Sequence, residues 1–294
     1  MARIAVYLER YTIARSEEMG AILRFGQVSQ RLGHRFDILF RPDMYKIPDY
    51  DALFIRALTD PLNSSYVAAR TAEVHGLRVI DDPTSIRICC DKVSMYGHLM
   101  KAGVPAPATE ILSAADLTLE RAGELLARLG TPVVLKAPNS SFSMYVEKAS
   151  TPEEVLRVGR RFLRRADRLV AQRFVRSAFD WRVGVLGGEV LYVCQYTIPR
   201  KQWKIMTWVG KGRVVAGPVK AFEVGAVDPR LLATARAAAA AVGTGLYGID
   251  LKEVDGEYVV IEVNDNPTLA EGEEDRKAPE LYERVIRYLA REWG

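Results

Sequence analysis

Short apolar segments alternate with longer helix-like segments over the first 82 residues, and this alternation constrains the fold more than any other feature. The apolar segments are 4–8, 36–40, 52–55 and 78–80. Between them, residues 16–32 and 63–75 carry apolar side chains at helical spacing, and a glycine follows each stretch. Strands that alternate with helices form a parallel sheet, because each helix carries the chain back to start the next strand in the same direction. The alternation therefore predicts a parallel α/β domain at the start of the chain.

The rest of the chain mixes helices with hairpins, which indicates an α+β arrangement. A single helix is predicted over 84–103, with Thr84 or Ser85 as its N-cap. Further helices are predicted at 116–129, 152–166, 228–242 and 279–292, strands at 133–136 and 169–174, and hairpins at 180–196 and 248–263. A chain of 294 residues has room for about two domains of common size. The order of the motifs described below divides it further, into units at 1–88, 89–174 and 175–294.

Composition and charge exclude several classes of protein. Apolar residues make up 49% and charged residues 27% of the chain, as in an ordinary globular protein. No apolar run approaches the roughly 18 residues of a membrane span, and the apolar stretch at the N-terminus is too short for a signal peptide. The three cysteines, two of them adjacent, form no disulfide framework, so we expect a cytoplasmic protein with no membrane partner. The net charge of +4 is too small by itself to predict a nucleic-acid partner.

Acidic side chains interrupt the apolar strands of the hairpin at 248–263. Asp250 lies on the first strand, Glu262 on the second, and Asn264 follows two residues later. A three-residue turn at 254–256 would make Glu262 a diagonal neighbour of Asp250 on one face of the sheet, whereas a two-residue turn would separate them. We predict the three-residue turn, because two carboxylates and an amide oxygen on one face suit Mg²⁺. An amphipathic hairpin with solvated acids is the alternative.

Basic side chains lie at several places where a polyphosphate could be bound. Lys136 ends the apolar strand 133–136, and the Ser- and Asn-rich segment after it could wrap phosphate groups. Lys92 in the helix 84–103, Arg182 in the first hairpin and Lys204 after that hairpin are further cations. Each alone is also consistent with a solvated surface side chain. Together they favour a site for a polyphosphate.

Two other patterns have simpler explanations. Arginines recur at helical spacing at positions 157, 160, 161, 164, 165 and 168. This stripe is typical of a solvated helix face, with an acidic partner or a nucleic acid as the alternative. The segment 243–248 matches a dinucleotide-binding glycine motif, but that motif needs a strand before it and a helix after it, and here the order is reversed.

In this order, the motifs resemble those of the ATP-grasp superfamily, and more narrowly those of the RimK-type carboxylate–amine ligases with a RimK-like N-terminal domain. The similarity spans most of the chain. It is carried by 54–56, 79–83, 89–93, 103–107, 134–136, 141–143 and, most specifically, Glu262-Val263-Asn264-Asp265-Asn266-Pro267. The resemblance implies an ATP-grasp fold, part α/β and part α+β, with an N-terminal parallel α/β (pre-ATP-grasp) domain. In this fold two subdomains hold ATP between them.

The resemblance also implies roles for particular residues. Nucleotide contacts are assigned to Lys92, Lys136, Ser141, Ser143, the hinge Gln172-Arg173-Phe174-Val175, and Asp180 near the ribose. Arg182 and Lys204 would face the transferred phosphate, and Arg56 would hold a substrate carboxylate. Asp250, Glu262 and Asn264 would bind Mg²⁺, with Mn²⁺ as an alternative.

The implied activity is that of an ADP-forming ligase, which phosphorylates a carboxylate and lets an amine displace the phosphate. The expected substrate is an amino acid or a peptide, with the tail of a carrier protein as an alternative, and the expected assembly is a homodimer or a homotetramer. Three departures from the family pattern occur, at Arg173, in the glycine-free segment 143–146, and at Ile205-Met206. They leave open a non-catalytic ATP-binding regulatory module of the same fold.

Overall fold

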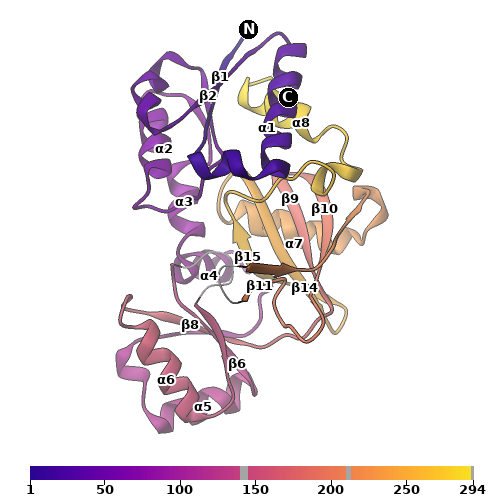
Figure 1. Cartoon of the computed structure of the whole chain (residues 1–294). Helices are drawn as coiled ribbons and strands as arrows, with labels where there is room; N and C mark the ends of the chain where they lie inside the picture. Colours follow the sequence, from indigo (N-terminus) through magenta and orange to yellow (C-terminus); the bar gives the residue numbers. More distant parts are fainter. Residues whose placement is uncertain (140–144, 210–212, 293–294) are drawn as a thin grey trace.

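A four-stranded sheet with the order β2-β1-β3-β4 opens the chain (Figure 1). The computed structural model describes residues 1–139, 145–209 and 213–292. The elements of this part are β1 Arg3–Tyr7, α1 Ser16–Arg31, β2 Arg35–Leu39, β3 Ala52–Ile55, α2 Ser64–Val74 and β4 Arg78–Ile80. All neighbouring strands are parallel, which confirms the prediction from the alternation of strands and helices.

The single helix predicted over 84–103 is wrong, because the chain forms two helices there. They are α3 Pro83–Cys89 and α4 Lys92–Lys101. Asp82 caps α3 by accepting hydrogen bonds from two backbone amides of its first turn, and Asp91 caps α4 by accepting one, from the amide of Val93. The cap at Asp91 interrupts the predicted helix, and the new helix α4 begins at Lys92.

A second four-stranded sheet follows, in the order β5-β8-β6-β7, and its neighbouring strands are antiparallel. Its strands are β5 Thr109–Leu112, β6 Val133–Lys136, β7 Val146–Ala149 and β8 Leu169–Arg173. The helices α5 Leu119–Leu129 and α6 Pro152–Phe162 pack on each other and share an apolar core with this sheet (Figure 1). We refer to this part as the middle sheet.

The third sheet has five strands in the order β13-β10-β9-β14-β15. They are β9 Phe179–Leu186, β10 Glu189–Thr197, β13 Val219–Phe222, β14 Leu246–Val254 and β15 Glu257–Asn264. A separate ribbon consists of β11 Met206–Val209 and β12 Arg213–Ala216. Helix α7, Pro229–Ala240, packs on the face that carries Val183 and Ile249, so Arg182 and Asp250 alternate to the opposite face.

Short 3₁₀ helices complete the described elements, at Arg10–Ala14, Arg41–Asp49, Ala114–Asp116, Val224–Ala226 and Glu274–Lys277. None of the helices in the described ranges has the length and apolar character needed to cross a membrane.

The turn of the β14–β15 hairpin differs from the prediction. Val254 pairs with Glu257, so the turn has two residues, Asp255 and Gly256. Their φ angles are 52° and 81°, the positive values that a type I′ turn requires at both positions. The predicted three-residue turn is therefore wrong.

A bulge further along the hairpin places Asp250 and Glu262 on the same face of the sheet, as predicted. Leu251 pairs with Val260, but Asp250 pairs with Glu262, so Ile261 is an extra residue on the second strand. The bulge shifts the register by one residue between the turn and the acids. Asp250 and Glu262 therefore lie directly opposite each other on one face, as cross-strand neighbours rather than as the predicted diagonal pair.

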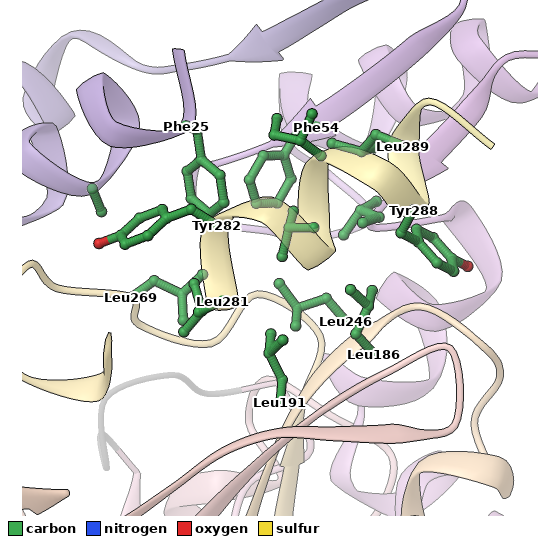
Figure 2. Packing of buried hydrophobic residues seen from close by; sticks show 14 of the residues in the cluster. Phe25, Phe54, Leu186, Leu191, Leu246, Leu269, Leu281, Tyr282, Tyr288 and Leu289 are labelled. Atoms are coloured by element: carbon green, nitrogen blue, oxygen red, sulfur yellow. The ribbon is translucent and has the colours of Figure 1, made fainter. Parts of the chain in front are cut away.

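The last helix, α8 Leu281–Leu289, returns to the N-terminal sheet. Figure 2 shows it between Phe25 and Phe54 of the N-terminal part and Leu246 of the five-stranded sheet. The ring of Phe25 meets that of Tyr282 with centroids 4.8 Å apart and that of Phe54 at 5.2 Å, both edge-on. These two sheets therefore share one apolar core with α8 in its centre.

Truncating the centre of this core should destabilise the protein strongly. Phe25 is 1% exposed, so Phe25→Ala should lower the free energy of unfolding by about 3–5 kcal/mol through lost burial and the cavity left behind. Leu23→Ala on the same helix is the matched control, because Leu23 is 58% exposed and its loss should change stability by about 0.5 kcal/mol or less. Denaturant unfolding followed by circular dichroism measures both, and equal effects would contradict the described core.

Candidate active site

Charged side chains lie next to one another on three neighbouring strands of the five-stranded sheet. Arg182 of β9 pairs in register with Asp250 of β14, which pairs in turn with Glu262 of β15. The guanidinium of Arg182 donates from Nε to Oδ1 and from Nη2 to Oδ2 of Asp250, both at 2.7 Å. The side-chain amide of Asn264 donates to the carbonyl of Gly248 at 3.1 Å and to Oδ2 of Asp250 at 3.3 Å. The three residues assigned to the metal thus lie together, with Arg182 beside them.

Burial and neighbouring cations act in opposite directions on the two carboxylates. Asp250 is 5% exposed, and burial raises its pKa although Arg182 lowers it. Burial also raises the pKa of Glu262, but Lys92 and Lys136 oppose this effect, and the net result is a pKa below the usual value. Glu262 is therefore ionised at neutral pH, which is the form that binds a cation.

Two lysines approach Glu262 from other elements. Lys92, the first residue of α4, is 4% exposed, and its Nζ lies 2.8 Å from Oε1 of Glu262. Lys136, the last residue of β6, is 6% exposed, and its Nζ donates to the hydroxyl of Tyr96 at 2.8 Å and to the carbonyl of Ile261 at 3.4 Å. Both lysines assigned to phosphate therefore lie beside the face that carries the acids.

Tyr96 is a residue of this site that the sequence motifs do not reveal. It is fully buried on α4, and its hydroxyl, which accepts from Lys136, also lies 2.5 Å from the carbonyl of Ile261 and 3.1 Å from Oε1 of Gln172. It thereby joins α4, β6, β8 and β15 at one point. Its position four residues after Lys92, on the same face of the helix, is the signal that could have found it.

The predicted hinge residues lie where β8 leaves the middle sheet. Gln172 is 2% exposed, and its Nε2 donates to Oγ1 of Thr109 at 2.8 Å, so its side-chain amide forms a hydrogen bond within the protein. Arg173 ends β8 with an exposed side chain, and Phe174 and Val175 begin the connection to β9. The hinge thus joins the middle sheet to the five-stranded sheet.

Lys204 lies among aromatic side chains near this hinge. Its Nζ lies 4.9 Å from the ring centroid of Trp203 and donates to the carbonyl of Val146 at 2.6 Å. Trp203 meets Phe174 edge-on at 5.9 Å, and Nζ of Lys148 lies 4.5 Å from the ring of Phe174. Burial lowers the pKa of Lys204. Lys204 therefore lies against β7 of the middle sheet, whereas Arg182 contacts Asp250 and Tyr196 of the five-stranded sheet.

Asp180 lies two residues before Arg182 on the same face and forms an ion pair with Lys252. The two residues are 8% and 7% exposed, and Nζ of Lys252 also donates to Oγ of Ser177 at 3.0 Å. The residue assigned to the ribose thus carries an internal salt bridge. Lys252 is a second site residue outside the predicted set, and its position two residues after Asp250 is the signal for it, because the two share a sheet face.

Arg56 lies directly after β3 and contacts the chain beyond β15. Its Nη1 donates to Oδ1 of Asn266 and to the carbonyl of Pro267, the latter at 2.9 Å. Burial lowers the pKa of Arg56, whereas the nearby Asp81 raises it. The side-chain amide of Asn266 donates in turn to the carbonyl of Ala57. The residue assigned to a substrate carboxylate therefore joins the N-terminal sheet to the segment that follows β15.

The segment after Lys136 connects β6 to β7. The predicted phosphate contacts Ser141 and Ser143 lie outside the residues that the structure describes. The hydroxyl of Tyr145, directly after them, accepts from Arg165 at 2.6 Å. All six arginines of the predicted stripe are exposed, as expected for a solvated face.

The donor set on β14 and β15 fits a divalent cation such as Mg²⁺. Within the described ranges, no group of three side chains from His, Cys, Asp and Glu could hold a metal ion, so a third ligand has to come from another residue type. Asn264 meets this need, because its amide nitrogen makes the two hydrogen bonds above and its oxygen remains to accept. Asp250, Glu262 and Asn264 would hold the ion, and hard oxygen ligands in this number leave coordination positions for phosphate oxygens.

Residues 89–289 match the family model described as the RimK-like ATP-grasp domain. This match covers more than half of the chain, and the protein therefore belongs to the RimK-like ATP-grasp family. Enzymes of this family use ATP to join a carboxylate to an amine through a C–N bond. The match confirms the resemblance seen in the sequence motifs.

Curated relatives and solved structures agree with this assignment. A probable alpha-L-glutamate ligase of Thioalkalivibrio sulfidiphilus is 27% identical over 75% of this chain and 69% of its own length. The glutamate–LysW ligase ArgX of Sulfolobus acidocaldarius is 25% identical over 74% of each chain.

Among solved structures, D-cycloserine synthetase DcsG superposes with a TM-score of 0.74 at 17% identity, over 98% of this chain and 99% of its own. A RimK domain ATP-grasp protein from Sphaerobacter thermophilus reaches 0.67 at 19% identity, over 98% and 100%. These structures show the shared fold and confirm the predicted ATP-grasp architecture.

Breaking the buried Asp180–Lys252 pair on one side should destabilise the protein. Lys252→Met leaves Asp180 buried without its counter-charge, which should cost about 3–5 kcal/mol of unfolding free energy, whereas the double variant Asp180→Leu/Lys252→Met should recover most of that loss. Glu253→Ala is the control on the same strand, because Glu253 is exposed. Thermal or denaturant unfolding measures the set, and a double variant no more stable than Lys252→Met would contradict the pairing.

Proposed function

We propose that the protein is an ADP-forming carboxylate–amine ligase that works through an acyl phosphate. The observation that carries the proposal is the meeting of Lys92, Lys136 and Arg182, from three different elements, at the sheet face of Asp250 and Glu262. Cations beside cation-binding carboxylates suit a magnesium-bound polyphosphate, because the lysines and the arginine match its phosphates and the carboxylates match its metal ion. The ion, when bound, supplies charge neutralisation at the phosphate oxygens.

In the first proposed step, a carboxylate oxygen of the substrate attacks the γ-phosphorus of ATP. The bond from that phosphorus to the β,γ-bridging oxygen breaks, ADP leaves with the bonding electrons, and an acyl phosphate forms. The transferred group spreads negative charge over several oxygens, so the protein contributes positioning and positive charge. We assign Arg182 and Lys204 to the transferred group, and Lys92 and Lys136 to the phosphates that leave with ADP.

In the second proposed step, the amine nitrogen attacks the carbonyl carbon of the acyl phosphate. A C–N bond forms, the C–O bond to phosphate breaks, inorganic phosphate leaves, and the nitrogen loses a proton. This route needs no nucleophilic side chain. Burial raises the pKa of Cys89, Cys90 and Cys194, so these thiols stay protonated and are poor nucleophiles. Their unpaired state also supports our proposal of a reducing, cytoplasmic setting.

The relatives suggest which substrates to test first. Two of them are named as glutamate ligases, one of these with LysW as its partner. We therefore propose an amino acid substrate, with glutamate tested first, and a peptide or a carrier-protein tail as the second partner. Arg56 is proposed to hold a substrate carboxylate, because it is a cation at the carboxyl end of a parallel strand, where α/β sheets bind ligands.

Removing a metal ligand should abolish turnover. Glu262→Ala should lower substrate-dependent ADP release by about 10²-fold or more, because the transferred charge loses its electrostatic support. Glu257→Ala on the same strand is the control, since its side chain is 76% exposed at the far end of the hairpin. A coupled ADP assay with ATP, Mg²⁺ and a panel of amino acids and dipeptides measures both variants.

Two outcomes of this assay would change the proposal. Unchanged turnover in Glu262→Ala would reject the metal assignment. Nucleotide binding by the unmodified protein without ADP release on any member of the panel would favour the non-catalytic ATP-binding module instead.

Nucleotide affinity should weaken as the pH rises above 8. Burial lowers the pKa of Lys136 to about 8, although Glu262, Asp180 and Asp250 raise it. Below this pH the side chain of Lys136 is a charged ammonium and attracts phosphate. Above it the side chain is a neutral amine, which must take up a proton before it can attract phosphate. The Kd of a non-hydrolysable ATP analogue should therefore rise by up to about tenfold per pH unit above 8.

The control for this prediction is Lys136→Arg, whose side chain stays charged over the whole range. Calorimetric titrations between about pH 7 and about pH 9.5 should show a much flatter dependence for this variant. The same slope in both proteins would assign the titration to another group and contradict the role of Lys136.

A further inference from the structure

We infer that Tyr196 and Glu274 position Arg182 in the site and tie it to the segment that follows the metal-site strand. The inference rests on the proposed function, in which Arg182 faces the transferred phosphate. Tyr196 and Glu274 are positioning residues, because they act through Arg182 and not on the reacting atoms.

Arg182 is held from two sides by its neighbours in the sheet. On one side, Asp250 accepts two hydrogen bonds of 2.7 Å from its guanidinium. On the other side, Arg182 pairs in register with Cys194, so Tyr196, two residues further along β10, is its diagonal neighbour on the same face. The ring centroid of Tyr196 lies 4.7 Å from Cζ of Arg182, a cation–π distance. The carboxylate and the ring together restrict the rotation of the guanidinium.

Glu274 holds Tyr196 in place. Glu274 is 1% exposed and is the first residue of the 3₁₀ helix Glu274–Lys277. Its Oε1 accepts from the hydroxyl of Tyr196, and its Oε2 accepts from the backbone amide of Ala270 at 2.7 Å. A buried carboxylate needs partners for its oxygens, so the position of Tyr196 and the conformation of the chain at Ala270 are fixed together.

The segment 264–274 connects this arrangement to the rest of the site. It begins at Asn264, the last residue of β15, and Arg56 donates to Asn266 and Pro267 within it. The segment is therefore held directly by Arg56 and linked to Arg182 through Glu274 and Tyr196. A substrate that binds beside Arg56 and moves this segment would change the position of Arg182 through contiguous contacts.

The test compares how tightly the protein binds a triphosphate and a diphosphate. Tyr196→Phe keeps the ring over Arg182 but removes the hydroxyl that donates to Glu274. Tyr196→Leu removes both the ring and the hydroxyl. We expect the affinity for a non-hydrolysable ATP analogue with Mg²⁺ to fall by about 10-fold in the first variant and about 10²-fold in the second, because a misplaced catalytic group loses its contact with the terminal phosphate. The affinity for ADP should stay within about twofold, because ADP lacks that phosphate.

Tyr282→Phe is the matched control. Tyr282 donates its hydroxyl to Oδ2 of Asp275 at 2.9 Å, so this variant loses a hydrogen bond to the same 3₁₀ helix without touching Tyr196 or Arg182. It should bind both nucleotides as the unmodified protein does, and its melting temperature shows whether the helix has loosened. Equal losses in Tyr282→Phe and Tyr196→Phe, or equal losses of the two nucleotides, would mean a merely structural role and overturn the inference.

Turnover separates this inference from the proposed function. If the unmodified protein releases ADP with a substrate and Tyr196→Phe matches it in kcat and in both affinities, the positioning role is wrong and the ligase proposal stands. If the unmodified protein releases no ADP but Tyr196→Phe selectively loses the triphosphate analogue, the ligase proposal is wrong and the positioning role stands.

Discussion

The pairing of buried charges on one face of the five-stranded sheet is the constraint on which the site depends. Arg182 pairs with Asp250, Lys252 pairs with Asp180, and Lys92 pairs with Glu262, and all six side chains except that of Glu262 are less than about a tenth exposed. A buried charge without a partner is far more costly than a buried pair. Because a slip of one residue turns every side chain of a strand to the other face, these pairs fix the register of β9, β14 and β15 together.

Such pairs specify an arrangement more than they stabilise it. Apolar side chains of similar volume in the same places would leave the fold equally stable or more stable, because desolvation offsets most of the attraction between buried charges. Stability comes from elsewhere, above all from the apolar cores around α8, around α7, and under α5 and α6. The stability of the fold therefore does not require the charges on this sheet face, and this agrees with the binding role that we propose for them.

The sequence predicts the strands and helices of the N-terminal sheet well, because their alternation is a pattern with one common solution. The helix at 84–103 is different, since Asp91 is compatible with a helix interior and becomes a cap only where the chain turns. The β14–β15 hairpin shows a second limit. Asp255-Gly256 is a strong local signal for a two-residue turn, while the acids require a register that such a turn does not give. The bulge at Ile261 meets both requirements, and no local sequence signal marks it.

The site residues divide in a similar way. The resemblance to the family motif assigns Lys92, Lys136, Asp250, Glu262 and Asn264 to one site, and the structure brings them together. Their roles toward phosphate and metal stay predictions. Tyr96 and Lys252 are ordinary residues of an α-helix and a β-strand until their partners are known. Their roles follow from the tertiary contacts of Lys136 and Asp180, which the linear sequence does not contain.

The distribution of the apolar cores also shows how the three larger sheets are joined to one another. The N-terminal sheet and the five-stranded sheet share one apolar core through α8, which packs them closely together. The middle sheet has a core of its own beneath α5 and α6. It is joined to the five-stranded sheet by the connection after β8, by the side chain of Val170 in the apolar core around α7, and by polar contacts such as those of Lys136 with Tyr96 and Ile261. Polar contacts exchange partners at lower cost than a packed core can be opened. Lys136 therefore lies where the middle sheet meets the face of Asp250 and Glu262, as a polar side chain that can change partners without the opening of a core.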